Sequence, residues 1–134
     1  MITYYSANKI LDLNFGSTSY TPPSTLYVGL STTTINIDGT GATEPSGGAY
    51  ARVAVTNTKS NFTSASNAVL TNSNAITFAE STASWGTITY VFLADALTGG
   101  NIWFYEALPV PKTVQTATTV LFSAGSLTLS MTNS

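Results

Sequence analysis

The chain has 134 residues, of which 43% are hydrophobic and only 7% are charged, and it contains no histidine and no cysteine. A Ser-His-Asp or Cys-His nucleophile, a disulfide and a thiolate metal site are therefore excluded. Four basic residues are too few to neutralise a nucleic-acid backbone, and no apolar run approaches the roughly 18 residues of a membrane span. We therefore expect a globular domain with an apolar core and with neither a nucleic-acid nor a membrane partner.

The first predicted element is a short helix over residues 5–15. Its apolar residues recur at spacings of three and four, as on one face of a helix: Ala7, Ile10, Leu11 and Phe15. Thr3 or Ser6 is placed to cap the start, and Gly16 follows the end. We expect this helix to close one end of its own domain, the alternative being an arm that docks on a neighbouring subunit. The N-terminus lacks a basic region followed by an apolar core, so no Sec signal peptide is expected.

From residue 25 onward, apolar and polar residues alternate in short segments, a pattern typical of β-strands. Eight strands are predicted, over residues 25–32, 50–57, 68–71, 75–78, 87–94, 101–107, 118–122 and 126–131. A polar, glycine-rich loop spans residues 33–49, a hairpin turn spans Asp95–Gly100, and Pro109–Lys112 is predicted to be a loop. The pattern predicts a mainly β fold: one antiparallel β-sandwich or jelly-roll-like domain over residues 1–134, with a short N-terminal helix.

Two predicted strands, 87–94 and 101–107, are apolar on both faces. Such strands are covered on both sides, either by a second sheet or by a neighbouring molecule. Charged residues, which usually protect the edges of a sheet and keep copies of a protein apart, are almost absent. We therefore expect the chain to form a homo-oligomer or to be covered by other subunits of a larger assembly.

The six carboxylates offer little chemistry. Glu106, beside an aromatic run, is the only one that we consider as a catalytic group, and solvation is the expected role of the others. Asp38 and Glu44 flank part of the glycine-rich loop and would be candidates for a Ca²⁺ site, but their spacing matches no EF-hand. We therefore predict no catalytic residue, no cofactor site and no metal site.

Aromatic side chains are the other candidates, because they stack on sugar rings in carbohydrate-binding modules. Trp103 and Tyr105 lie in the most apolar strand, which predicts a role in the core. For Trp85, at a strand entrance before Gly86, packing and sugar binding are equally favoured. The remaining candidates are Tyr20, Tyr27, Tyr50 and Tyr90.

Segments along nearly the whole chain form a recognisable series, and the most specific of them is EPSGGAYAR at Glu44–Arg52. The others are Asn8–Asp12, Tyr20–Pro23, Leu26–Thr32, Ala83–Thr89, Thr98–Asn101, Ala107–Leu108, Pro111–Val114 and Ala124–Leu129. In order and spacing they resemble a family of small tailed-bacteriophage virion proteins commonly labelled tail fiber protein. The resemblance implies a non-enzymatic structural protein, assembled in the bacterial host cytoplasm into the virion. Its partners would be copies of itself and other virion proteins, such as major capsid or tail proteins.

The position on the phage particle is a separate question. A single compact domain without a shaft or repeats favours a capsid decoration (cement) protein. The alternatives are a tail or neck accessory protein, a tail fibre subunit, and a carbohydrate-binding adhesin module that contacts host glycan. In a fibre, Trp85 and the loop Asp38–Gly48 would be the expected points of glycan contact.

Overall fold

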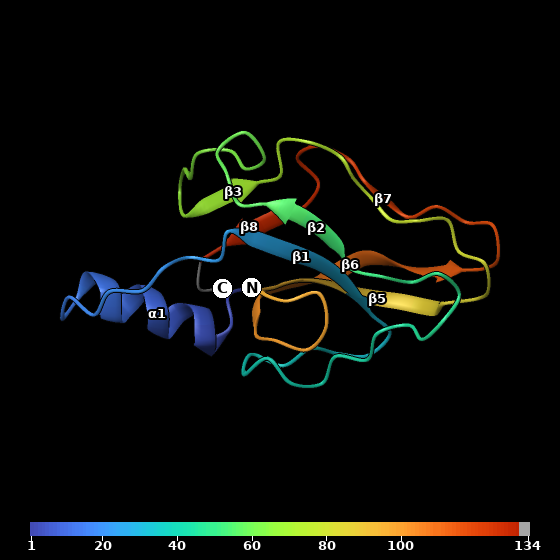
Figure 1. Ribbon diagram of the computed structural model, residues 1–134, viewed down its shortest axis with the longest axis horizontal. Helices are drawn as coiled ribbons and strands as arrows, with labels where there is room; N and C mark the ends of the chain where they lie inside the picture. Colours follow the sequence, from blue (N-terminus) through green and yellow to red (C-terminus); the bar gives the residue numbers. More distant parts are fainter. Residues whose placement is uncertain (132–134) are drawn as a thin grey trace.

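The computed structural model describes residues 1–131 and centres on a four-stranded antiparallel sheet (Figure 1). Its strands, in the order β2-β1-β5-β6, are β2 (Val53–Thr56), β1 (Thr25–Ser31), β5 (Gly86–Ala94) and β6 (Ile102–Val114). Two antiparallel ribbons complete the β structure: β3 (Val69–Thr71) with β8 (Thr128–Ser130), and β4 (Ile76–Thr77) with β7 (Leu121–Phe122). The prediction of a mainly β, sandwich-like fold is confirmed, and each of the eight predicted strands is present.

The core lies on both faces of β5, as the doubly apolar sequence predicts. Val91 and Leu93 belong to the larger cluster, which includes residues of the two ribbons, and Phe92 and Ala94 belong to a second cluster on the opposite face. Ile35, from the glycine-rich loop, is buried in the second cluster. The same chain therefore covers both faces of this strand.

Gly29 in β1 allows the second cluster to form. It lies opposite Phe92 in the pairing of β1 with β5, and a Cβ atom at Gly29 would overlap the Phe92 ring. The Arg52 guanidinium carbon lies 5.1 Å from the centre of the same ring. A glycine is required here because the aromatic ring passes directly over the backbone of β1.

The predicted loop at Pro109–Lys112 is wrong, because β6 continues through it to Val114. Ile88 pairs with Lys112 and Tyr90 with Ala107, so residues 108–111 form a bulge opposite Thr89. Proline is tolerated in an edge strand and at a bulge, where its missing N–H removes no ladder hydrogen bond. Pro109 and Pro111 are therefore accommodated within β6 and do not end the strand.

Helix α1 (Tyr4–Asn14) agrees with the predicted helix to within one residue at each end, and Thr3 is its N-cap. The Ser6 amide donates to Thr3 Oγ1 at 3.3 Å, and Thr3 Oγ1 donates to the Ile102 carbonyl at 2.7 Å. The preceding residues continue the sheet, since the Thr3 amide donates to the Trp103 carbonyl. The N-terminal end of the helix is thereby attached to β6.

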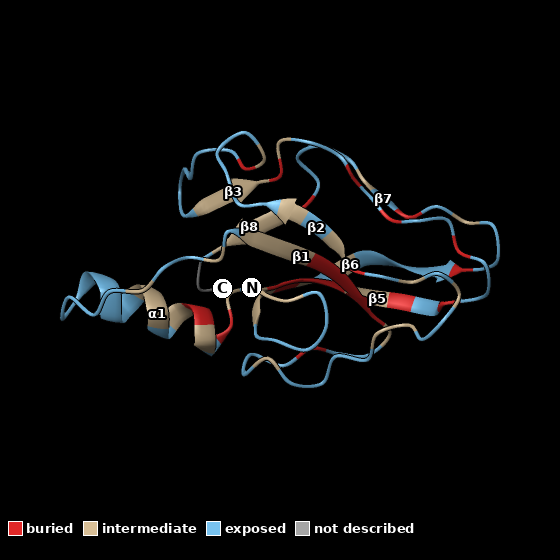
Figure 2. Ribbon diagram, in the orientation of Figure 1, coloured by how far each residue is buried: buried red, intermediate tan, exposed pale blue. Residues whose placement is uncertain are grey.

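The outer turns of α1 extend beyond the sheets (Figure 1), and their residues are mostly exposed (Figure 2). Leu11 is 53% exposed, Leu13 43% and Phe15 77%. The apolar face of the helix is thus covered near Ser6 and largely uncovered at the other end. Among residues 1–131, α1 is the one helix, and it is neither long nor apolar enough to cross a bilayer.

Candidate interaction surfaces

The candidate carboxylates Glu106 and Asp38 lie in different parts of the fold, in β6 and in the glycine-rich loop. Glu106 lies in β6 opposite Val91. Burial of the Met1 amino group lowers the pKa of that group, and the nearby charge of Glu106 partly offsets this effect. Asp38 accepts hydrogen bonds from the amide and hydroxyl of Thr40, at 3.0 and 2.6 Å, and these bonds lower its pKa. Within residues 1–131, no three acidic side chains gather where a metal ion could bind.

Glu44 forms a partly buried ion pair with Arg52. Arg52 donates from Nε to Glu44 Oε1 and from Nη2 to Oε2, both at 2.9 Å, while Tyr50 donates its hydroxyl proton to Oε1 at 2.7 Å. Arg52 Nη1 also donates to the carbonyls of Ala96 and Gly99, at 2.6 and 2.9 Å. The EPSGGAYAR segment therefore connects the glycine-rich loop to the β5–β6 hairpin and has a structural role.

The protonation of this cluster follows from its surroundings. Burial opposes ionisation of Glu44, but hydrogen bonds from Arg52 and Tyr50, together with the charge of Arg52, outweigh it and lower the pKa of Glu44. For Tyr50, burial and the Glu44 carboxylate raise the pKa of the phenol well above its ordinary value. At neutral pH the cluster holds one carboxylate, one guanidinium and a neutral phenol.

Trp85 lies in the core, so of the two roles expected equally for it, core packing is the one that the structure shows. Its side chain is 4% exposed, packs edge-on against Tyr50 and Phe78, and donates from Nε1 to the Gly48 carbonyl at 2.8 Å. Both the ring faces and the polar atom are therefore already used within the chain.

Trp103 is the more accessible tryptophan, contrary to the expected role in the core. It is partly buried, its ring centre lies 5.4 Å from that of Tyr5 and 6.1 Å from that of Tyr20, and its Nε1 donates to Asp95 Oδ2 at 3.2 Å. The Lys9 ammonium lies 5.5 Å from the centre of the Tyr5 ring. Alternation of residues located the strand, but the exposure of Trp103 depends on how α1 and the Tyr20 segment pack against it.

The Trp103 side chain lines a hollow of about 300 Å³, here called the aromatic pocket. Its walls come from α1, from the segment before β1, and from β1, β3, β5, β6 and β8, and they include Ser6, Ile10, Tyr20, Pro22, Leu26 and Trp103. Among the described residues, the buried Ser6 hydroxyl has no hydrogen-bond partner. The pocket is mainly apolar and its described lining includes no Asp, Glu, Lys or Arg, so it suits an apolar or aromatic group and not ionic chemistry.

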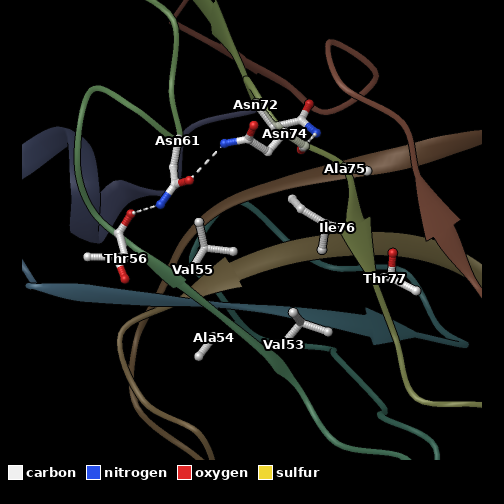
Figure 3. Close-up of a pocket in the computed structure, with 10 residues that line it drawn as sticks. All are labelled: Val53, Ala54, Val55, Thr56, Asn61, Asn72, Asn74, Ala75, Ile76 and Thr77. Carbon is white, nitrogen blue, oxygen red and sulfur yellow. Dashed lines mark hydrogen bonds between the residues drawn. The ribbon is translucent and has the colours of Figure 1, made fainter.

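A second hollow, the strand groove, lies between β2 and β4 and measures about 220 Å³ (Figure 3). Val53, Val55 and Ile76 contribute aliphatic side chains to it. Asn61 donates to the Thr56 carbonyl at 2.8 Å at one end of the groove. Its lining is aliphatic side chains, amides and hydroxyls, which can bind a neutral chain but supply no general acid or base.

Among residues 1–131, both hollows are lined mainly by aliphatic, aromatic and neutral polar side chains. Residues 1–130 match the family described as podophage GP4 fiber I protein gp80. The chain belongs to this phage fibre protein family and is a structural component of the virion, which confirms the resemblance seen in the sequence. No curated protein matches the chain at a significant level.

Proposed function

We propose that the chain is a non-enzymatic subunit of a fibre that projects from the phage particle, and that all 134 residues form one domain. The observation that carries this proposal is the extent of the family match, which reaches from residue 1 to residue 130. The fibre-protein character therefore belongs to this β domain itself and not to an appended segment.

The surface of the domain supports an assembled state. β2 and β6 are the outer strands of the four-stranded sheet, and α1 carries exposed leucine and phenylalanine side chains away from the sheets. The whole chain has a formal net charge of only −2, so little electrostatic repulsion opposes contact between copies. We infer that its partners are further copies of the chain and other virion proteins.

Capsid decoration is the second candidate. It is favoured by the arrangement of residues 1–131, in which the sheets pack on shared clusters and no shaft or repeat extends from them. A decoration protein would bind many equivalent sites on the head, whereas a fibre subunit would occur at a few points per particle.

Gold-labelled antibodies against the purified chain, applied to intact virions, separate the two functions by electron microscopy. Label along or at the base of projecting fibres supports the proposal. Label distributed over the head facets supports decoration instead, and the absence of label from particles in which immunoblotting also fails to detect the chain would overturn both. A virion lacking the gene is the matched control for antibody specificity.

A further inference from the structure

The outer edge of β2 carries backbone groups that the rest of the domain does not use. The Asn57 amide donates to the Ser24 carbonyl at 3.0 Å, in the same register that pairs β2 with β1. Because hydrogen-bonded pairs alternate along antiparallel strands, Val53 and Val55 direct their backbone groups toward β1. The N–H and C=O of Ala54 therefore point away from β1, and no hydrogen bond within residues 1–131 uses them.

The two outer strands of the four-stranded sheet differ in how their edges are protected. In β6, the Tyr105 amide donates to the Met1 carbonyl, so the first residues of the chain cover part of the edge. Pro109 and Pro111 lie in the bulge that follows. In contrast, β2 (Val53–Thr56) contains no charged residue, no proline and no bulge. Natural sheets usually protect a free edge with such features, so the edge of β2 is expected to pair with another chain.

The unused edge of β2 opens into the strand groove, which has an apolar floor. Val55 and Ile76 belong to the larger core cluster or pack against it, and Ala54 lies on the opposite side of β2 from Val55 (Figure 3). Asn74 donates to Asn61 Oδ1 at 2.9 Å and thereby links the two walls at one end. The volume of about 220 Å³ exceeds the roughly 150 Å³ cavity that is known to admit benzene. The groove therefore has room for side chains of another molecule.

We propose that the strand groove binds an extended, uncharged segment of another virion protein, which adds a further strand to the four-stranded sheet beside β2. Backbone hydrogen bonds to Ala54 would hold this segment, and apolar side chains at alternate positions would cover Val53 and Val55. The described lining includes no Asp, Glu, Lys or Arg, so a charged side chain would find no partner there. The inference deepens the proposed function and rests on it for the statement that the partner belongs to the virion.

The shape and chemistry of the groove favour an isolated segment over other occupants. Residues 72–77 form the wall opposite β2, so an added strand has to enter between two walls. The β2 edge of a second copy lies beside such a wall itself, so two β2 edges would be kept apart. A sugar is disfavoured because the described lining offers no aromatic ring for stacking. A terminus or a long loop of a different chain meets neither obstacle.

Ala54→Pro tests the pairing directly. Proline removes an N–H that points away from β1 and leaves the bonds to β1 intact, so the domain should still fold. In a phage whose gene is disrupted and supplied from a plasmid, purified particles should contain about tenfold less of this variant than of the natural chain, by quantitative immunoblot. Ala107→Pro is the matched control and should leave the amount unchanged. Ala107 is exposed in the other outer strand, two residues after Tyr105, whose amide points away from β5.

Thr77→Lys is a second variant that does not change the backbone. Thr77 is exposed and lines the groove, so a lysine there would place a charged side chain where the segment has to lie. This variant should also reduce the amount in particles about tenfold. Thr98→Lys, at an exposed position of the β5–β6 hairpin, adds the same charge and should have no effect. Urea unfolding of the purified chains identifies any variant that fails to fold.

Equal incorporation of the folded groove variants and their controls would overturn the inference. Sedimentation of the purified chains tests for a second copy, since the natural chain, Ala54→Pro and Thr77→Lys should all have the same mass. If either variant dissociated an oligomer of the natural chain, the groove would hold a second copy and the inference would be wrong. The immunoblot does not depend on where the chain sits on the particle. Failure of the fibre proposal in gold labelling is therefore distinguishable from failure of the groove proposal.

Discussion

Replacing Arg52 with alanine should destabilise the domain more than any other change to a charged residue. The side chain is 6% exposed, makes two hydrogen bonds to Glu44 and donates to two backbone carbonyls. Removing one partner of a buried pair typically costs about 3–5 kcal/mol. Glu44 is 28% exposed, so water can partly solvate its freed carboxylate, and we expect a loss of about 2–4 kcal/mol. That is a large part of the roughly 5–15 kcal/mol that stabilises an ordinary domain.

Urea unfolding followed by tryptophan fluorescence measures this loss. Arg52→Lys retains the charge but not the two-pronged contact, so it should fall between the natural chain and Arg52→Ala. Lys59→Ala is the control, because Lys59 is exposed and makes a single 3.2 Å hydrogen bond, to the Thr63 carbonyl. A loss below about 1 kcal/mol for Arg52→Ala, or one equal to that of the control, would refute the reasoning.

The same ion pair predicts a pH dependence. Because the pKa of Glu44 is lowered in the folded chain, its ionised form favours folding. This contribution is complete above the unfolded pKa of glutamate, about 4.3, and is lost as the pH falls through the lower folded value. The free energy of unfolding of the natural chain should therefore decline more steeply below about pH 4 than that of Glu44→Gln. If the free energies of unfolding of the natural chain and of Glu44→Gln declined equally below about pH 4, the lowered pKa of Glu44 would be contradicted.

Three further predictions concern other parts of the fold. Gly29→Ala should destabilise the domain by about 1–3 kcal/mol in urea unfolding, because its methyl group overlaps the Phe92 ring, and an unchanged midpoint would contradict that contact. The raised pKa of Tyr50 favours the folded state below the unfolded tyrosine pKa of about 10. Stability should therefore fall as the pH rises above about 10, and Tyr50→Phe should remove part of this decline. Acrylamide should quench the fluorescence of Trp103 more than that of Trp85, measured in the Trp85→Phe and Trp103→Phe variants respectively; the reverse order would contradict their placement.

The strands could be predicted from sequence because alternation reports directly on which side of a strand is buried. The same rule located the helix, where apolar spacing and the Thr3 cap gave both ends to within one residue. It failed at Pro109–Lys112, because a proline marks a turn in sequence but is also accepted in a bulge of an edge strand. Whether a strand lies at the edge depends on the order of strands in the sheet, which local sequence does not contain.

The surfaces were harder to predict than the strands. The sequence left the environment of Trp85 open and placed Trp103 in the core, whereas Trp85 is the more buried of the two. Burial at each position is set by segments distant in sequence, Gly48 for Trp85 and Tyr5 for Trp103. Glu44 was considered as a calcium ligand, although Arg52 in the same EPSGGAYAR segment is the partner that binds its carboxylate. An acid and an arginine eight residues apart, on either side of a glycine pair, were the available signal for that ion pair.

Disruption of the gene in the phage tests the fibre assignment most directly. Particles assembled without the chain should have normal, genome-filled heads and should lack one class of projecting fibre by electron microscopy, and a plasmid copy of the natural gene should restore it. Particles that retain every fibre but have heads that lose their genome under mild heating would contradict the assignment and favour capsid decoration.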